Sequence, residues 1–369
     1  MKLDPAKFRY GIEHEFPCID KEGRFVDFST ATFDDLNKII ADLPIYESDY
    51  PRLRVGDLGI KKKRWYIEGF ERFSDQGVFD HLDIKGFEIR TPICSSIEQT
   101  VAVLEKDYSL WKDTAARHGY RPAAISFNPF KTEFVLEPPL NQWEKNYLES
   151  IEEPQSYIHM LTYGPDISIS HPDIISEQMI DIARKLIHYS PYILPFSFSS
   201  PFYDNDAWGG LSYRTLYRTS IRPAVRIFLA DDAHMIKATP PFTEVARIPA
   251  EIGRIEYKAF DMIYDMELYP SLVALIQGII LDDTLTGRSD TPDIALHELS
   301  AREGFTNEVI FSVANQILNV ARKSLSTDEF EFIDALQKML AERRSPANDM
   351  IDRYKQGESI RAIINNSIK

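Results

Sequence analysis

The sequence predicts an α+β protein, and three features of its 369 residues support this class. Segments rich in aromatic and β-branched residues come early, amphipathic helical patterns separate some of them, and helical periodicity runs almost throughout from Ser271 onward. This order is typical of a sheet with segregated helices and differs from regular βαβ winding. Because no internal repeat and no Gly/Ser-rich linker divides the chain, we expect a single domain over residues 1–369. Its sheet-forming core should span residues 1–265, and a helical C-terminal subregion should span residues 266–369.

Strands are predicted where residues alternate between polar and apolar, or where aromatic and β-branched residues gather. These segments are 10–19, 63–73, 87–91, 158–170 and 254–260. In the fourth segment, Asp166, Ser168 and Ser170 would lie on one strand face and two isoleucines on the other. We therefore expect a sheet with one polar and one apolar face.

One helix follows the third predicted strand. Ser95 to Glu98 has the spacing of a capping box, and apolar residues at steps of four and three follow as far as Ala115, before Gly119. This pattern predicts an amphipathic helix.

A second helix is expected over about residues 174–189. Asp173 or Ser176 would cap its start, and Pro191 and Pro195 would end it. The later helical region should be interrupted near Gly287 to Pro292 and again near Ser326.

Composition excludes several classes of protein. Acidic residues outnumber basic ones by 57 to 42, giving a net charge of -15, and such a surface repels a phosphate backbone, so nucleic acid is not an expected partner. No apolar run reaches the roughly 18 residues that cross a bilayer, and the polar start lacks a signal-peptide core. We therefore expect a cytoplasmic protein without a membrane partner. Cys18 and Cys94 are too few for a disulfide framework and should be buried and reduced.

A basic run, Lys61-Lys62-Lys63-Arg64, stands directly before the second predicted strand. Charged side chains commonly protect the edge strand of a sheet from pairing with another chain. We interpret the run as solvated charges at a strand edge and not as a binding patch.

Carboxylates occupy positions on three predicted strands where alternation would point them to one face. Glu13 and Glu15 are two residues apart and would place hard oxygen ligands about 6 to 7 Å apart. A carboxylate flanked by cations occurs twice more, in Gly86-Phe-Glu88-Ile-Arg90 and Gly253-Arg254-Ile-Glu256-Tyr-Lys258. Converging carboxylates need cations between them, and oxygen-only ligation favours magnesium or manganese over zinc. The alternative is that each carboxylate is the exposed position of a half-buried strand.

Arginines recur at every fourth position after the segment Gly209-Gly-Leu-Ser-Tyr213-Arg214-Thr215. The series comprises Arg214, Arg218, Arg222 and Arg226. On a helix they would line one face and could bind phosphate or carboxylate groups. The alternative is a surface helix with ordinary ion pairs, although few acidic residues lie nearby in the sequence.

Five motifs, in this order, resemble the type 2 glutamate-cysteine ligase, or carboxylate-amine ligase, family over most of the chain. They are Gly11-Ile-Glu-His-Glu-Phe16, Phe87-Glu-Ile-Arg-Thr-Pro92, Leu194-Pro-Phe-Ser-Phe-Ser-Ser-Pro-Phe202, Gly210-Leu-Ser-Tyr-Arg-Thr215 and Arg254-Ile-Glu-Tyr-Lys-Ala-Phe-Asp261. The Ser-Pro-Phe and Ser-x-Arg-Thr pair is the most specific part of the resemblance.

The resemblance implies a glutamine-synthetase-like fold, a curved and largely antiparallel sheet whose concave face holds ATP, divalent metal ions (Mg²⁺ or Mn²⁺) and an amino acid. It also implies a reaction in which ATP phosphorylates a carboxylate, usually that of glutamate, and the amine of cysteine or another acceptor attacks the acyl phosphate. The expected partners are thus a small-molecule acid and amine, and the resemblance suggests a homodimer. Such a reaction needs positioning and charge neutralisation more than a covalent nucleophile.

Carried onto this sequence, the resemblance makes Glu13, Glu15, Glu88 and Glu256 candidate metal ligands. It makes Arg214, as the cation at the transferred phosphate, and Glu256 candidate catalytic residues. The candidates for substrate or nucleotide binding are Arg90, Asp166, Ser168, Ser170, Tyr213, Arg218, Arg222, Arg254 and Lys258.

The sequence departs from the family pattern at three places. Asp166, Ser168 and Ser170 stand where the family has His-x-His-x-Gly, so no imidazole is available there as a ligand or cation. Lys258 replaces the arginine of the usual Glu-x-Arg, which exchanges a planar fork for a point charge. Ser199 stands where an asparagine is expected before Ser-Pro-Phe.

His171 follows the altered strand and invites a catalytic role, but alternation points it away from the face that carries Asp166. We interpret it as a capping or structural histidine. Two other functions remain open at the level of sequence: a metal-dependent phosphotransferase on the same platform, and a non-catalytic relative that binds a nucleotide.

Overall fold

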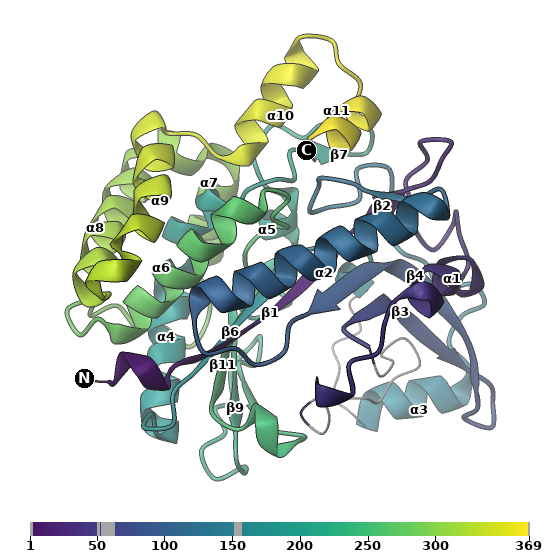
Figure 1. Ribbon diagram of the computed structural model, residues 1–369. Coiled ribbons are helices and arrows are strands. Elements are labelled where there is room, and N and C mark those ends of the chain that lie inside the picture. The colour runs from purple at the N-terminus through teal and green to yellow at the C-terminus, as the bar shows by residue number, and fades with distance from the viewer. Residues whose placement is uncertain (1–2, 50–51, 53–62, 151–156, 368–369) are drawn as a thin grey trace.

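The computed structural model describes residues 3–49, 52, 63–150 and 157–367, and it confirms the α+β class (Figure 1). The strands are β1 (Arg9–Phe16), β2 (Cys18–Ile19), β3 (Trp65–Phe73), β4 (Phe79–Arg90), β5 (Arg121–Pro122), β6 (Pro165–Ser170), β7 (Phe202–Tyr203), β8 (Asp206–Ala207), β9 (Val225–Leu229), β10 (Thr243–Val245) and β11 (Arg254–Tyr257). The helices are α1 (Phe33–Asp42), α2 (Ile97–Arg117), α3 (Gln142–Ser150), α4 (Ser176–Ile193), α5 (Tyr213–Arg218), α6 (Tyr269–Leu281), α7 (Ile294–Glu303), α8 (Glu308–Ser324), α9 (Phe330–Glu342), α10 (Pro346–Lys355) and α11 (Ile360–Asn366).

One large sheet organises the described part of the chain, with seven strands in the order β10-β9-β11-β6-β1-β4-β3. Neighbouring strands are antiparallel except β10 and β9, which confirms the largely antiparallel sheet. β1 lies between β6 and β4, and its register places Glu13 opposite Asp166 on β6 and Glu15 opposite Glu88 on β4. The first two glutamates of the sequence therefore face different neighbours.

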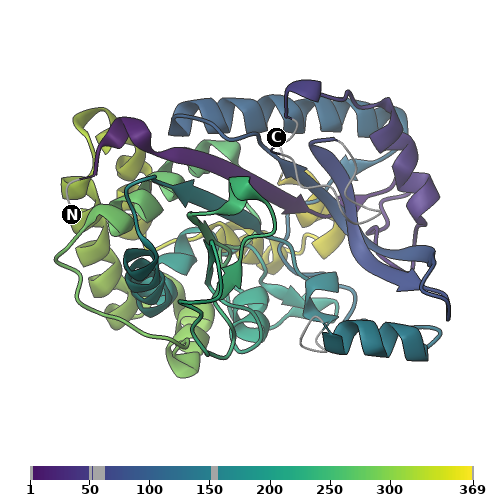
Figure 2. The ribbon, with the colours of Figure 1, turned by 90° about the horizontal axis from the view of Figure 1, so that it is seen from below.

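Helices cover the apolar face of this sheet. Alternation along β6 buries Ile167 and Ile169 and leaves the three polar side chains partly exposed, as predicted. The helix α2 packs against β1 and β4, and α4 packs against β9 and β11. Figure 2 shows α2 lying along one side of the strands. Aromatic rings of Phe16, Phe87 and Trp111 meet between sheet and helix at centroid distances of 4.6 to 6.1 Å.

The C-terminal helices form a group beside the sheet, in which α6, α8 and α9 pack on one another (Figure 1). Breaks fall at residues 282–293 and near Ser326, where they were predicted. The division of the domain at residue 265 remains a prediction. No helix in the described part of the chain is both long and apolar enough to cross a membrane.

The helix α2 forms where it was predicted, but its cap is Ser96 and not Ser95 of the predicted capping box, and α4 differs from its predicted limits. Ser96 caps α2 and accepts a hydrogen bond from the Gln99 amide. The residue that precedes α4 is Ile175, whose side chain cannot cap, so neither predicted cap is used. Pro191 lies inside α4 and does not end it, because the fully buried Ile193 and its neighbours hold the last turn against the core.

Three predicted strands are shorter than expected. Pro17 has no amide hydrogen, and it separates β1 from β2 within the segment 10–19. The segment 158–170 forms a strand only from Pro165, after a 3₁₀ turn. The last strand ends at Tyr257 because the chain then turns into the network around Asp261 described below.

The basic run before β3 does border an edge strand, but its charges are engaged. Lys61 and Lys62 lie outside the described residues. Lys63 donates to the carbonyl oxygens of Ile40 and Leu43 at the end of α1. Arg64 forms ion pairs with Asp49 and Asp107 at 2.8 and 3.0 Å. The interpretation as solvated charges is therefore wrong for these two residues. Cys18 and Cys94 are buried and form no disulfide with each other, as predicted.

Candidate active site

A cavity of about 530 Å³ lies on the polar face of the central sheet, opposite α2. Every candidate residue from the sequence lines it except Tyr213. The cavity brings together Glu13, Glu15, Glu88, Arg90, Asp166, Ser168, Ser170, Arg214, Arg218, Arg222, Arg254, Glu256 and Lys258. The strand residues among them converge because alternation points them to one sheet face, whereas Arg214, Arg218 and Arg222 reach the cavity from α5 and the segment after it.

The carboxylates of the cavity form two groups. The first trio, Glu13, Asp166 and Glu256, offers three oxygen atoms that all lie within 4.8 Å of one another. Two cations accompany it. The Lys258 ammonium contacts Glu256 at 2.7 Å and forms an ion pair with Asp166, and Arg254 contacts Glu256 at 3.1 Å. Each carboxylate of the first trio therefore has a cation within ion-pair distance, since Arg254 also lies 3.9 Å from Glu13.

The second trio, Glu15, Glu68 and Glu88, has the same compact spacing of oxygen atoms, within 4.8 Å. Its cation is Lys85, which contacts Glu68 at 2.7 Å and Glu15 at 3.0 Å. Glu88 is buried, and its Oε1 atom has no hydrogen-bond partner among the described residues. The second trio is thus less compensated than the first.

In each trio one carboxylate has a lowered pKa, Glu256 in the first and Glu68 in the second, whereas burial raises the pKa of the other two, which in the first trio are Glu13 and Asp166. Burial acts to raise the pKa of Glu256, but the charges of Lys258 and Arg254 outweigh it, and this pKa falls to about 2. In the second trio, burial and the charge of Glu68 raise the pKa of Glu15 to about 8. Burial and neighbouring carboxylates also raise the pKa of Glu88 well above its usual range. Both trios therefore hold carboxylates that favour the protonated form more than an exposed carboxylate does.

Glu68 and Lys85 were missed in the sequence, and a β-bulge explains why. Glu68 pairs with Gly86 and Gly69 pairs with Ile84, so Lys85 is an extra residue on β4. The bulge turns the Lys85 side chain toward the cavity, although strict alternation would point it to the apolar face. A side chain at Gly69 would have its Cβ atom only 2.1 Å from the Asp83 carbonyl oxygen. The glycine beside a glutamate in 63–73 was the available signal for this irregularity.

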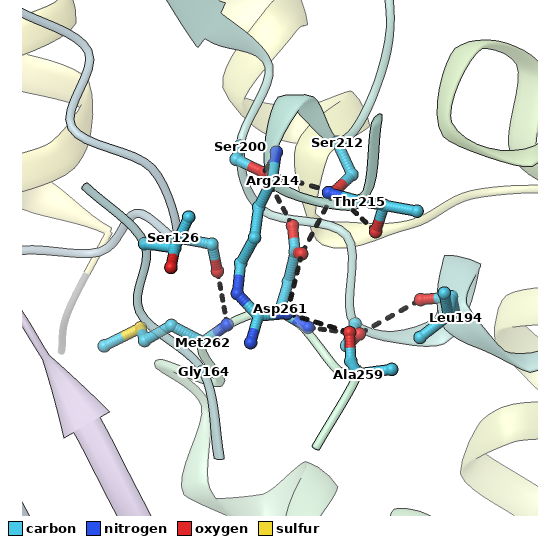
Figure 3. A network of polar contacts seen from close by, with 12 residues as sticks. Ser126, Gly164, Leu194, Ser200, Ser212, Arg214, Thr215, Ala259, Asp261 and Met262 are labelled. Carbon is cyan, nitrogen blue, oxygen red and sulfur yellow. Dashed lines mark hydrogen bonds and ion pairs between the residues drawn. The ribbon is translucent and has the colours of Figure 1, made fainter. Parts of the chain in front are cut away.

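The two most specific motifs of the sequence meet around Asp261, behind the cavity wall (Figure 3). Asp261 accepts hydrogen bonds from the Ser199 amide, the Ser200 hydroxyl and the Ser212 hydroxyl at 2.9, 2.8 and 3.0 Å. Ser199, which replaces the expected asparagine, also donates to the Met262 carbonyl. The serines of both motifs therefore build a buried scaffold and do not line the cavity.

This scaffold holds Arg214 in place. Its guanidinium lies 3.8 Å from Asp261 and donates to the carbonyl oxygens of Ala259 and Lys258 at 2.8 and 3.2 Å. A Cβ atom at Gly164 would come within 2.3 Å of this guanidinium, so the glycine leaves the space that Arg214 occupies. The Arg214 Nε atom is buried and has no partner in the described part of the chain.

The arginine series does not form one helical face. The helix α5 ends at Arg218, and Arg226 lies on β9, so the predicted helix is wrong beyond its first two arginines. All four arginines nevertheless line the cavity. Burial and the charges of Arg214 and Arg222 lower the pKa of Arg218 to about 9, which marks a strongly positive wall. Arg226 is paired with Glu244 at 2.9 Å.

Two further residues lie away from the cavity. Tyr213 stacks on Tyr203 at a ring distance of 4.1 Å and packs against Phe127, which explains why it cannot reach a molecule in the cavity. His171 is buried, with its Nε2 atom 3.0 Å from the Asp4 carbonyl and its Nδ1 atom accepting from the Asp173 amide. Its position agrees with the structural interpretation.

Comparison with solved structures shows which class of fold this is. The chain is similar to a bifunctional glutathione synthetase from Pasteurella multocida, with 13% identity, a TM-score of 0.58, and coverage of 98% of this chain and 51% of that one. It is also similar to a glutamate-cysteine ligase from Francisella tularensis solved in complex with AMP, with 10% identity, a TM-score of 0.59, and coverage of 99% and 88%. The fold is that of these ligases, and the glutamine-synthetase-like fold predicted from the sequence is confirmed.

Sequence comparison identifies the family. Residues 9–227 match glutamate-cysteine ligase family 2, and the chain belongs to this family. A protein named "Putative glutamate--cysteine ligase 2" from Jannaschia sp. (strain CCS1) is 27% identical over 207 residues, which cover 52% of this chain and 53% of that protein. A protein of the same name from Corynebacterium glutamicum (strain R) is 24% identical over 288 residues, or 71% of each chain. The match thus spans about half of the first relative's length.

Proposed function

We propose that this protein is an ATP-dependent ligase that joins the carboxylate of a small acid to an amine and forms an amide, as in γ-glutamyl bond formation by glutamate-cysteine ligases. The observation that carries the proposal is the joining of two buried carboxylate trios and a wall of arginines in one cavity. Family membership and the similarity to ligases of known structure support it. A neutral or purely apolar cavity in the same fold would not support this function.

The cavity suits a magnesium- or manganese-dependent phosphoryl transfer. The donor set consists of oxygen atoms alone, and a buried Glu88 oxygen lacks a partner among the residues that the structure describes, so the site fits a hard divalent cation. Among the carboxylates that would hold it are the predicted ligands Glu13, Glu15, Glu88 and Glu256. When bound, such a cation neutralises phosphate oxygens and polarises the activated carboxylate.

The arginines would position the substrates. Arg214, fixed by the Asp261 scaffold, is proposed to stabilise the charge that develops on the transferred phosphoryl group. Arg218 and Arg222 lie beside it on the same wall and would bind nucleotide phosphates or a substrate carboxylate, as would Arg90 and Arg254. The acid would be activated as an acyl phosphate, which the amine then attacks, releasing phosphate.

Two polar residues of β6 occupy the middle of the site. The Ser168 hydroxyl lies 3.5 Å from Glu256, and Ser170 lines the cavity beside Arg254. Hydroxyl groups there can bind a substrate by hydrogen bonds but cannot supply the charge of an imidazolium. We therefore expect a donor acid or an acceptor amine that can differ from glutamate and cysteine. The cytoplasmic location and the homodimer remain predictions.

The decisive experiment measures ADP and phosphate release from ATP and Mg²⁺ with glutamate and other small acids, each combined with a panel of amines, and with mass spectrometry of the products. We expect release that depends on both substrates and a new mass equal to the amide. Release with transfer of phosphate to a nitrogen, and no amide, would identify a phosphotransferase. Nucleotide binding without turnover across a broad panel of acids and amines would identify a binding relative.

A further inference from the structure

The two carboxylate trios differ in a way that bears on how many metal ions the site takes. In the first trio, Lys258, the residue that follows β11, forms ion pairs with Glu256 on β11 and with Asp166 on the neighbouring strand β6. The Lys258 side chain is largely buried, with 19% of its surface exposed, and its ammonium lies between two carboxylates of the trio, those of Glu256 and Asp166. An ammonium is a compact point charge that can take the place of a metal ion among carboxylate oxygens.

Arg254 adds a second positive charge to the first trio, so two cations accompany its three carboxylates. Its guanidinium contacts Glu256 at 3.1 Å and lies over the Phe228 ring at 4.0 Å, which fixes the orientation of the side chain. A divalent cation entering between Glu13, Asp166 and Glu256 would meet two positive charges at short range, and one of them would have to be displaced. The cations of the first trio are therefore side chains of the protein itself, Lys258 and Arg254.

The second trio lacks this compensation. Lys85 contacts Glu15 and Glu68, but no described cation forms an ion pair with Glu88. Among the described residues, the buried Glu88 Oε1 atom has no hydrogen-bond partner, which independently indicates that the second trio binds a further ligand. The Glu15 Oε2 atom accepts a hydrogen bond from the Gly164 amide at 3.1 Å, which fixes this carboxylate within the trio. Glu68 completes the set from the neighbouring strand β3.

We propose that, before nucleotide binds, the protein takes a single divalent cation at the second trio, while the Lys258 ammonium occupies the first trio in place of a second one. This inference rests on the proposed function and narrows its metal assignment: Glu15, Glu68 and Glu88 hold the ion, whereas Glu13 and Glu256 form ion pairs with the chain itself. The chemical class of the ligand is a hard divalent cation such as Mg²⁺ or Mn²⁺.

The test counts Mn²⁺ bound to the full chain without nucleotide, by isothermal titration calorimetry and by electron paramagnetic resonance of free Mn²⁺. The wild type should bind one ion, and Lys258→Met should bind two. Lys237→Met, which removes the same charge from an exposed lysine outside the cavity, should still bind one. Two ions in the wild type, none in the wild type, or one in a folded Lys258→Met variant would each overturn the inference.

A second pair of variants tests the assignment if Lys258→Met does not fold. Glu88→Gln should abolish the single Mn²⁺ site, whereas Glu256→Gln should leave Mn²⁺ binding within about twofold of the wild type, a difference of about 0.4 kcal/mol. The reverse pattern would overturn the inference and place the ion in the first trio. These readouts are independent of turnover. An active ligase that binds two ions refutes this inference alone, and one bound ion without amide formation refutes the proposed function alone.

Discussion

The two faces of the central sheet are built by the same strands and differ in nearly every physical property. One face carries Phe16, Phe87 and the isoleucines of β6, which are buried beneath the helices that cover this face, among them α2 and α4. The other face carries glutamates, arginines and lysines around the cavity. Burial of the apolar face stabilises the fold, whereas burial of like charges on the polar face costs stability until a ligand or cation compensates them. Substitutions on the two faces should therefore affect different quantities.

The largest effect should come from the apolar face. Phe87→Ala removes a fully buried ring that contacts Phe16 and Trp111, and we expect it to lower the free energy of unfolding by about 3–5 kcal/mol, because a cavity is left between sheet and helix. Urea unfolding followed by fluorescence and circular dichroism measures this. Val78→Ala, at an exposed turn position, is the matched control and should change stability by less than about 0.5 kcal/mol. If Phe87→Ala lowers the free energy of unfolding no more than Val78→Ala does, packing on the apolar face does not stabilise the fold as described.

A substitution on the cavity side should act on catalysis. Arg214→Met should slow ADP release by roughly 100- to 1,000-fold, equivalent to about 2.7–4 kcal/mol of transition-state stabilisation, because a fixed cation is lost where charge develops. Arg226→Met is the control, since Arg226 also lines the cavity but is already paired with Glu244. Equal rates for Arg214→Met and the wild type, with a folded protein by circular dichroism, would remove Arg214 from its proposed role.

The buried His297, which lies behind the cavity wall, should make the stability of the folded state depend on pH. Burial lowers the pKa of His297 to about 4, below its usual 6.5, so the folded state disfavours its protonation. Since the unfolded chain binds the proton more readily, stability from this group is present above pH 6.5 and is lost as the pH falls toward 4. By pH 4.5 the loss should be about 2 to 3 kcal/mol.

This prediction can be isolated with one variant. His297→Gln should unfold with a smaller difference between pH 8 and pH 4.5 than the wild type, by about that same 2 to 3 kcal/mol. At pH 8 the His297 imidazole is neutral in both the folded and the unfolded wild type. The difference in stability between variant and wild type at this pH therefore reports any change in packing and serves as the internal reference. An unchanged difference between the two pH values would show that His297 does not contribute to acid sensitivity.

The smallest expected effect is at the start of α4, which packs on the apolar side. Ile175 precedes this helix, is 59% exposed and offers no capping oxygen. Ile175→Asp should raise the free energy of unfolding by about 0.5–1 kcal/mol, because a carboxylate can accept from the free amides and suits the positive end of the helix. Ile175→Ala removes the apolar side chain without adding a cap. If both variants are equally stable in urea, capping is not the cause.

Local sequence was enough for the elements with strong end signals and clear periodicity. The periodicity of α2 and the alternation of β6 were predicted correctly, although the cap of α2 lies one residue later than predicted, because each pattern depends on residues close together in the chain. The start of α4, the length of the helix after Arg214 and the strand before Pro165 were not predicted correctly. In these places packing against distant parts of the chain outweighed local preference.

The sequence by itself determined that the polar residues of β1, β6 and β11 reach the cavity, because alternation along a strand fixes the face on which each residue lies. Only the tertiary structure decided how they group. Glu13 and Glu15 are neighbours on one strand face, yet they belong to different trios, because β1 has β6 on one side and β4 on the other. The entry of Lys85 through a bulge and of Glu68 from β3 depends on the same strand order. Strand order is set by long-range packing of the apolar face, which no local pattern encodes.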